Sequence, residues 1–162
     1  MTAPKRIQLR RTKGWRMPEN TVKVARPTKW GNPFKVGHTQ TRCPRVGDTS
    51  TADWEYEGRL DKTSGTRQAY VHNDNTVTWH DIEDATAEQC VILYAEYIGA
   101  VPVHHLDYQP NRKDQEEFVA MVRAELRGKN LACFCPLTDA QGNHVPCHAD
   151  VLLELANGGA ER

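Results

Sequence analysis

The chain has 162 residues, a hydrophobic content of 38% and a mean hydropathy of −0.70, which suit one domain with a modest core and many loops. No stretch approaches the roughly 20 apolar residues of a membrane helix, and the first residues lack the apolar region of a signal peptide. We therefore expect one cytoplasmic domain over residues 1–162, with no membrane partner and with cysteines that are reduced thiols or metal ligands.

Charge is segregated along the chain although the formal net charge is zero. Residues 1–45 hold twelve Lys/Arg and one acid, a net charge of +11, and residues 46–162 hold the balancing excess of acids. Two explanations stand side by side: the regions attract each other within one fold, or the basic region faces a phosphate-bearing partner.

Two short strands are predicted in the N-terminal quarter, over residues 7–9 and 21–25, where apolar and β-branched residues occur in short runs. Pro27 ends the second strand because proline cannot donate to a ladder. Residues 37–82 read as an elaboration on the core, with a hairpin over residues 70–79.

Two helices follow. Thr86 with Gln89 three positions later forms a capping-box pattern, and the helical spacing of apolar residues then continues until Gly99. A second helix is predicted from Asp114, with acids in its first turn, and the basic and glycine residues 127–129 close it.

The C-terminal part predicts strand and helix in close succession. Residues 101–106 and 130–135 have strand length, and a last helix opens at Cys147. We expect an α/β domain whose small, mostly parallel sheet is flanked by helices, with an inserted hairpin region. The termini, residues 1–5 and 157–162, are expected to be flexible.

The most informative feature is a set of four soft ligands or nucleophiles within sixteen positions: Cys133, Cys135, Cys147 and His148. Alternate side chains of a strand share one face, so Cys133 and Cys135 are expected to point the same way, with Cys135 at the carboxyl end of its strand. Cys147 and His148 would open the next helix, whose N-terminus stabilises an anion or a thiolate.

Three interpretations of this set remain open. All four residues could ligate zinc. Alternatively, Cys147 or Cys135 is a reactive thiolate with His148 or His144 as its proton partner, and Cys147, His148 and Cys135 are the catalytic candidates. In the third interpretation, the cysteines are small core residues.

A second patch, RPTKWGNPF over residues 26–34, combines cations, aromatics and a rigid backbone. Arg26 and Lys29 could hold phosphate, and Asn32 could read an amide or base edge. In the basic loop before it, cations surround Trp15, which suits a phosphate and a stacked base or a solvated flexible arm. The candidate substrate-binding residues are Arg16, Arg26, Lys29, Trp30 and Asn32, although packing also suits Trp30.

Four motifs carry a resemblance to a known family: residues 17–22, 26–34, 126–137 (LRGKNLACFCPL) and 147–152 (CHADVL). Together they resemble the phage and bacterial domain-of-unknown-function family 4326. Phe134 stands where that family often has tryptophan. The resemblance implies an origin in phages or mobile elements and a link to nucleotide or nucleic-acid metabolism.

These observations predict an enzyme of phage or bacterial nucleotide or nucleic-acid metabolism. It would act on a nucleotide, nucleoside or modified base through the Cys/His site, with zinc as the possible cofactor. The alternative is a zinc-stabilised, non-catalytic nucleic-acid-binding module that uses the basic N-terminal region as its contact surface.

Overall fold

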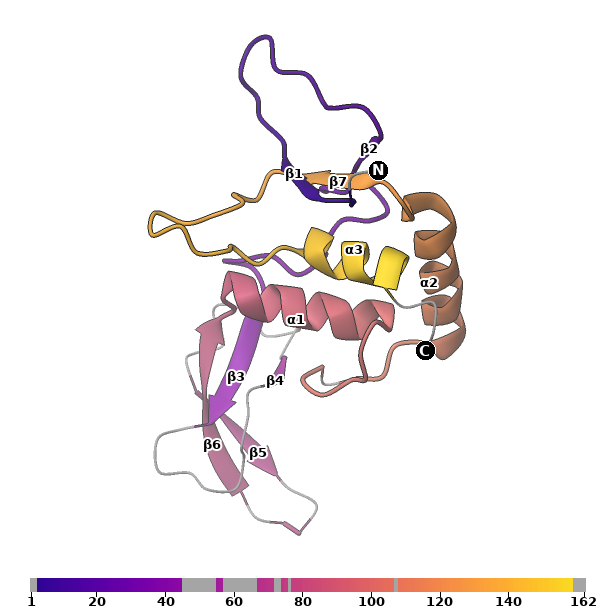
Figure 1. Ribbon diagram of the computed structural model, residues 1–162. Coiled ribbons are helices and arrows are strands. Elements are labelled where there is room, and N and C mark those ends of the chain that lie inside the picture. The colour runs from indigo at the N-terminus through magenta and orange to yellow at the C-terminus, as the bar shows by residue number, and fades with distance from the viewer. Residues whose placement is uncertain are drawn as a thin grey trace.

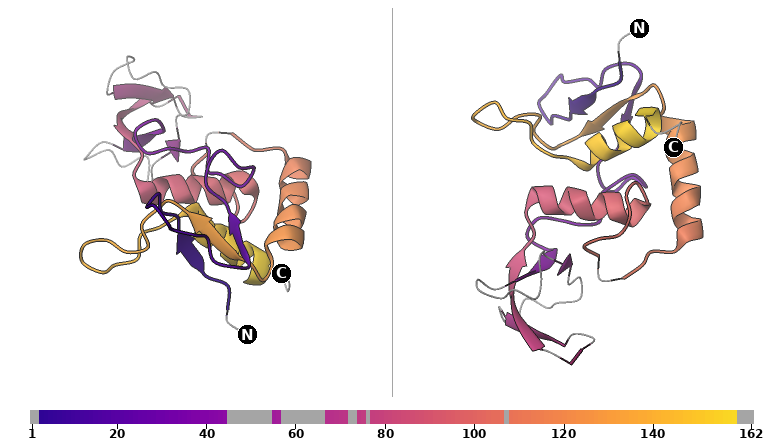
Figure 2. Two further views of the ribbon diagram at one scale, coloured as in Figure 1. Left: turned by 90° about the horizontal axis from the view of Figure 1, so that it is seen from above. Right: turned by 60° about the horizontal axis from the view of Figure 1, so that its bottom comes forward.

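The computed structural model describes residues 3–44, 55–56, 67–71, 74–75, 77–106 and 108–158. Helices separate two sheets, so that layers follow one another from the top to the bottom of Figure 1: a parallel sheet, two helices and an antiparallel sheet. A third helix runs along the side of these layers, as both views of Figure 2 show. The predicted α/β class is confirmed.

The parallel sheet has three strands in the order β1-β7-β2, with bounds β1 Arg6–Gln8, β2 Thr21–Lys23 and β7 Asn130–Cys133. Both outer strands run parallel to β7, so the carboxyl ends of all three strands meet at one edge. The middle strand is buried, with Leu131 and Ala132 at 0% exposure. The segments that follow the three strands therefore lie close together at that edge.

The predicted strand over residues 130–135 is two residues shorter in the structure and ends at Cys133. Its ladder ends there because the paired residues of β1 and β2 end at Gln8 and Lys23. Cys135 therefore lies outside the strand, and strand alternation does not explain how it meets Cys133.

The three helices are α1 Ala87–Ile98, α2 Arg112–Leu126 and α3 His148–Gly158. The predicted capping box of α1 is present, and Gly99 ends the helix in the left-handed conformation, with φ of 86°. Helix α2 begins two residues before the predicted Asp114, because the Asn111 side chain accepts the Asp114 N–H and caps the helix there. Helix α3 packs against β7 and both other helices.

The antiparallel sheet has the order β4-β3-β6-β5, with bounds β3 Gln40–Pro44, β4 Glu55–Tyr56, β5 Arg67–Val71 and β6 Val77–Asp84. Strands β5 and β6 form the predicted hairpin. Strand β6 leads through Ala85 and Thr86 directly into α1.

The strand predicted over residues 101–106 is wrong. The backbone N–H groups of His104, His105 and Leu106 instead donate to one carboxylate oxygen of Glu96, at 2.8–3.1 Å. This buried carboxylate, on the preceding helix, takes the donors that a ladder would have needed.

Of the termini predicted to be flexible, residues 1–2 and 159–162 lie outside the described part, whereas residues 157 and 158 are the last two of α3. The single-domain assignment stays a prediction. Within the described residues, no helix is both long enough and apolar enough to cross a bilayer.

Candidate metal centre and anion-binding pocket

The carboxyl edge of the parallel sheet carries a pocket of about 460 Å³. Arg11 follows β1, Arg26 follows β2, and the cysteine motif continues from β7. Since the three strands are parallel, these segments converge although they lie far apart in sequence. The polar and sulfur-bearing side chains around the pocket are Arg11, Arg26, Asn32, Lys35, Cys90, Cys133, Cys135, Cys147 and His148.

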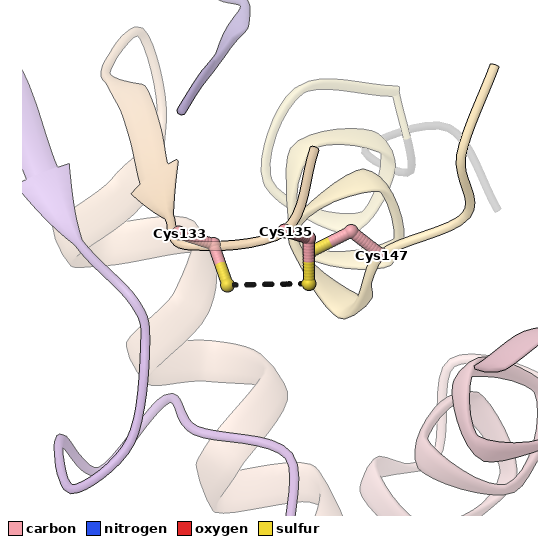
Figure 3. Close-up of side chains that lie close together, drawn as sticks. All are labelled: Cys133, Cys135 and Cys147. Carbon is pink, nitrogen blue, oxygen red and sulfur yellow. Dashed lines mark hydrogen bonds between the residues drawn. The ribbon is translucent and has the colours of Figure 1, made fainter. Parts of the chain in front are cut away.

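Three thiols form the core of this site. The Sγ atoms of Cys133, Cys135 and Cys147 all lie within 4.8 Å of one another, and those of Cys133 and Cys135 are 3.7 Å apart (Figure 3). Tetrahedral zinc with Zn–S bonds of about 2.3 Å separates two sulfur ligands by roughly 3.8 Å. The spacing therefore fits a single metal ion, and these three residues could hold one.

The thiols affect one another's ionisation. Hydrogen bonding with Cys135 and Cys147 lowers the pKa of the Cys133 thiol. The pKa values of Cys135 and Cys147 are raised, chiefly through their hydrogen bonds with Cys133 and, for Cys147, also with Cys135; burial and the charge on Cys133 add to the shift. A thiolate is thus favoured at Cys133, and its negative charge disfavours ionisation of the other two thiols. A bound cation would counter this repulsion, which fits the donor set to a metal.

His148 lies beside the thiol group without being a member of it. Its Nε2 donates to the Val24 carbonyl at 2.8 Å, so in the neutral ring Nδ1 carries the lone pair. That Nδ1 lies 3.6 Å from the Cys147 Sγ. Burial lowers the pKa of His148. The fourth residue of the predicted zinc set is therefore positioned as a neighbour of the cluster, with its tautomer fixed by the backbone.

Arg6 clamps the loop that joins the two halves of the cysteine motif. Its side chain is 5% exposed. Nη2 donates to the carbonyls of Pro136 and Leu137 at 2.9 and 3.3 Å, and Nη1 donates to the Val145 carbonyl at 2.8 Å. One side chain of β1 thus holds both ends of the loop, directly after Cys135 and shortly before Cys147.

Asp150 completes this clamp from the first turn of α3. One carboxylate oxygen accepts from Arg6 Nη1 at 3.0 Å and from the Cys147 backbone N–H at 3.1 Å, and it also contacts His144 Nε2 at 2.8 Å. Sequence reasoning missed both members of this pair. Asp150 could have been found as an acid in the first turn of a helix, whereas nothing local marks Arg6.

Three cations line the pocket together with the thiols: Arg11, Arg26 and Lys35. Among the described residues, no carboxylate lies within ion-pairing distance of any of them. Arg26 Nη1 donates to the Asn32 carbonyl at 2.7 Å, and the Arg11 guanidinium lies 4.6 Å from the ring centre of Phe134. These contacts hold the two guanidinium groups in place and leave their charge available to an anion.

The predicted meeting of the two motifs is present, since Arg26 and Asn32 line the same pocket as the cysteines. The Asn32 amide is already used: Nδ2 donates to the Cys90 carbonyl at 3.1 Å, and Oδ1 accepts the Phe34 N–H at 2.9 Å. Asn32 thus shapes the turn. The Arg26 side chain can approach this turn closely because residue 31 is glycine: a Cβ there would lie 2.9 Å from the Arg26 Cγ.

Three other substrate candidates lie elsewhere. Lys29 forms an ion pair with Glu125 at 2.9 Å and faces a different pocket. Trp30 is buried at 4% exposure and packs edge-on against Phe118. Arg16 is exposed on the loop between β1 and β2 and does not line the thiol pocket.

The fold and the site define a small α/β protein with a candidate three-cysteine metal centre at the carboxyl edge of its parallel sheet. The chain matches the family described as Domain of unknown function (DUF4326) over residues 7–158, and it belongs to that family. No curated protein and no solved structure matches it.

Proposed function

We propose that this protein is a zinc enzyme that acts on a nucleotide, nucleoside or modified base held in the thiol pocket. One observation carries the proposal: three thiols spaced for one ion share a pocket with three cations that have no carboxylate partner among the described residues. Sites with three protein ligands and a free fourth position are typical of catalytic zinc, whereas structural zinc is usually held by four.

The thiols of Cys133, Cys135 and Cys147 would hold the ion. Zinc held by these three residues would supply Lewis-acid activation of a water molecule. His148 lies beside Cys147. Its Nε2 proton is donated to the Val24 carbonyl, and its Nδ1 lone pair is 3.6 Å from the Cys147 Sγ. Nδ1 is therefore the atom that would accept a proton as the reaction proceeds.

Arg11, Arg26 and Lys35 would bind the phosphate or another anionic group of the substrate. The guanidinium of Arg26 suits bidentate contact with phosphate oxygens. Helix α3 begins at His148 in the same pocket, and its N-terminus adds free N–H groups and partial positive charge. The substrate's anion and its reacting atom would thus lie in the same pocket.

The first experiment is metal analysis of protein purified without chelator. We expect about one zinc ion per chain in the wild type, and a loss of most of that zinc in Cys147→Ala, because two thiols hold the ion far more weakly than three. Cys90→Ala is the matched control: this cysteine is also buried and lines the pocket but stands outside the thiol group. Wild-type protein without stoichiometric metal, or equal zinc in both variants, would refute the metal centre.

Chelation separates this proposal from a structural metal in a non-catalytic nucleic-acid-binding module. Under the proposal, the zinc-free protein keeps its far- and near-ultraviolet circular dichroism at 25 °C and loses turnover on a panel of nucleotides and nucleosides. A structural metal contributes folding energy, so its removal would unfold the domain. Unfolding on chelation, together with no turnover by the loaded protein, would favour the binding module.

A further inference from the structure

The loop between β1 and β2 is anchored at its centre. Trp15 is half-buried and packs against the core, and its backbone N–H donates to the Thr12 carbonyl at 3.0 Å. Gly14, inside this turn, has a φ of 85°, which favours glycine. The loop is therefore a built surface, in contrast to the solvated flexible arm that the sequence also allowed.

This loop presents cations without carboxylate partners. Arg10, Lys13 and Arg16 are exposed, and no carboxylate among the described residues lies within ion-pairing distance of them. Arg11, on the same loop, is one of the three cations of the thiol pocket. Figure 1 shows the loop rising from the parallel sheet on the side away from α3. The pocket's positive wall thus continues outward along the loop.

Phe134 fixes the junction between pocket and loop. It stands between two of the thiol-bearing residues and is 38% exposed, with Arg11 4.6 Å and Lys23 5.7 Å from its ring centre. Cation–π attraction of this kind holds a cation at a set position. Phe134 therefore holds Arg11 where the loop meets the pocket.

We propose that the substrate is a nucleotide within a single-stranded nucleic acid, whose backbone leaves the pocket along the β1–β2 loop. The inference rests on the proposed function, because the pocket is taken to hold the reacting nucleotide. Three cations in the pocket suffice for a free nucleotide, whereas consecutive phosphates of a strand match the further cations outside it.

The burial of the thiols favours a single strand over a duplex. Cys133 and Cys147 are 6% and 1% exposed, so a reacting group must enter the pocket to reach them. A base paired and stacked in a duplex cannot do so without being extruded, which costs its pairing and stacking free energy. A strand whose bases are already free avoids that cost.

The experiment measures how salt weakens binding of labelled single-stranded DNA and RNA of about 12 nucleotides by the zinc-loaded protein, between roughly 50 and 200 mM salt. The loop variant is Arg10→Gln/Lys13→Gln/Arg16→Gln. The control, Lys5→Gln/Lys113→Gln/Lys129→Gln, removes the same charge: Lys5 and Lys129 precede β1 and β7 at the opposite edge of the sheet, and Lys113 lies on α2.

We expect the loop variant to lower the slope of log K against log salt by about 2, since each lost phosphate contact on a single strand removes about 0.7. The control should keep the wild-type slope, and neither variant should change competition by a nucleoside monophosphate. Equal slopes in the two variants, or wild-type binding of the strand no tighter than of the monophosphate, would overturn the inference. DNA and RNA arms show which sugar the site accepts.

The two proposals fail in different ways. The Cys147→Ala variant tests the pocket chemistry through its loss of metal and turnover. It should leave unchanged the slope of strand affinity against salt that the loop cations produce. A loop variant that retains zinc and monophosphate binding but also retains full strand affinity contradicts the strand path alone.

Discussion

At the scale of single residues, Arg6 connects the first strand to the candidate metal centre. Three of its four hydrogen bonds fix the loop on both sides, and the partner in the fourth, Asp150, also accepts the Cys147 N–H. Groups that orient metal ligands in this way commonly change metal affinity when they are mutated. Arg6 therefore acts as a positioning residue for the thiols.

We expect Arg6→Lys to weaken zinc binding by roughly 10- to 100-fold, because lysine keeps the charge near Asp150 but cannot reach the loop carbonyls as a fork. Competition with a chromogenic zinc chelator measures this change, and circular dichroism checks that the fold is retained. Arg10→Lys, at an exposed position just beyond β1, is the control. A variant with wild-type zinc affinity would show that the thiols need no such clamp.

At the scale of elements, Glu96 couples α1 to the segment that follows it. Burial alone would raise the pKa of this carboxyl, but the backbone N–H groups of residues 104–106 and the His105 side chain, 2.6 Å away, together lower it. A carboxyl whose pKa is lower in the folded state binds fewer protons there than in the unfolded chain. Its contribution is therefore present above its ordinary value of 4.5 and is lost as the pH falls through the lower, folded pKa.

We expect Glu96→Gln to lower the free energy of unfolding by about 1–3 kcal/mol at neutral pH, since a neutral amide is a weaker acceptor for several donors. The difference from the wild type should shrink below pH 4.5, where Glu96 of the unfolded chain begins to bind protons, and should vanish as the pH falls through the lower pKa of the folded state. Urea unfolding at several pH values tests both statements. Glu117→Gln, at an exposed position of α2, should be nearly neutral throughout, and a pH-independent effect of Glu96→Gln would contradict the explanation.

At the scale of the whole molecule, the candidate ion would join the end of β7 to the start of α3 while most of the core lies elsewhere. We expect chelation to lower the melting temperature by several degrees and zinc to restore it, with the increase growing with the logarithm of free zinc. Differential scanning calorimetry at several zinc concentrations measures this. Cys147→Ala should melt at one temperature whatever the zinc concentration, and a wild type with equally invariant melting would argue against the site.

The sequence predicted the features that depend on neighbours in the chain. The capping box at Thr86 and the hairpin follow from local pattern, and so did the grouping of the cysteines, while the parallel pairing was expected from the close succession of helix and strand. What it could not supply depends on long-range partners. Lys29 looked free for phosphate, but Glu125 on α2 pairs with it, and the Arg6 clamp joins residues more than 130 positions apart in sequence.

The order of strands in the parallel sheet has a consequence for how the protein forms during synthesis. The middle strand, β7, leaves the ribosome after both of its neighbours and after α1 and α2. Strands β1 and β2 pair only with β7 in this sheet. They therefore cannot pair there until more than a hundred further residues have been translated. Pairing over such separations is slow. The backbone groups of β1 and β2 that pair with β7 would stay unpaired in the nascent chain until its synthesis is nearly complete.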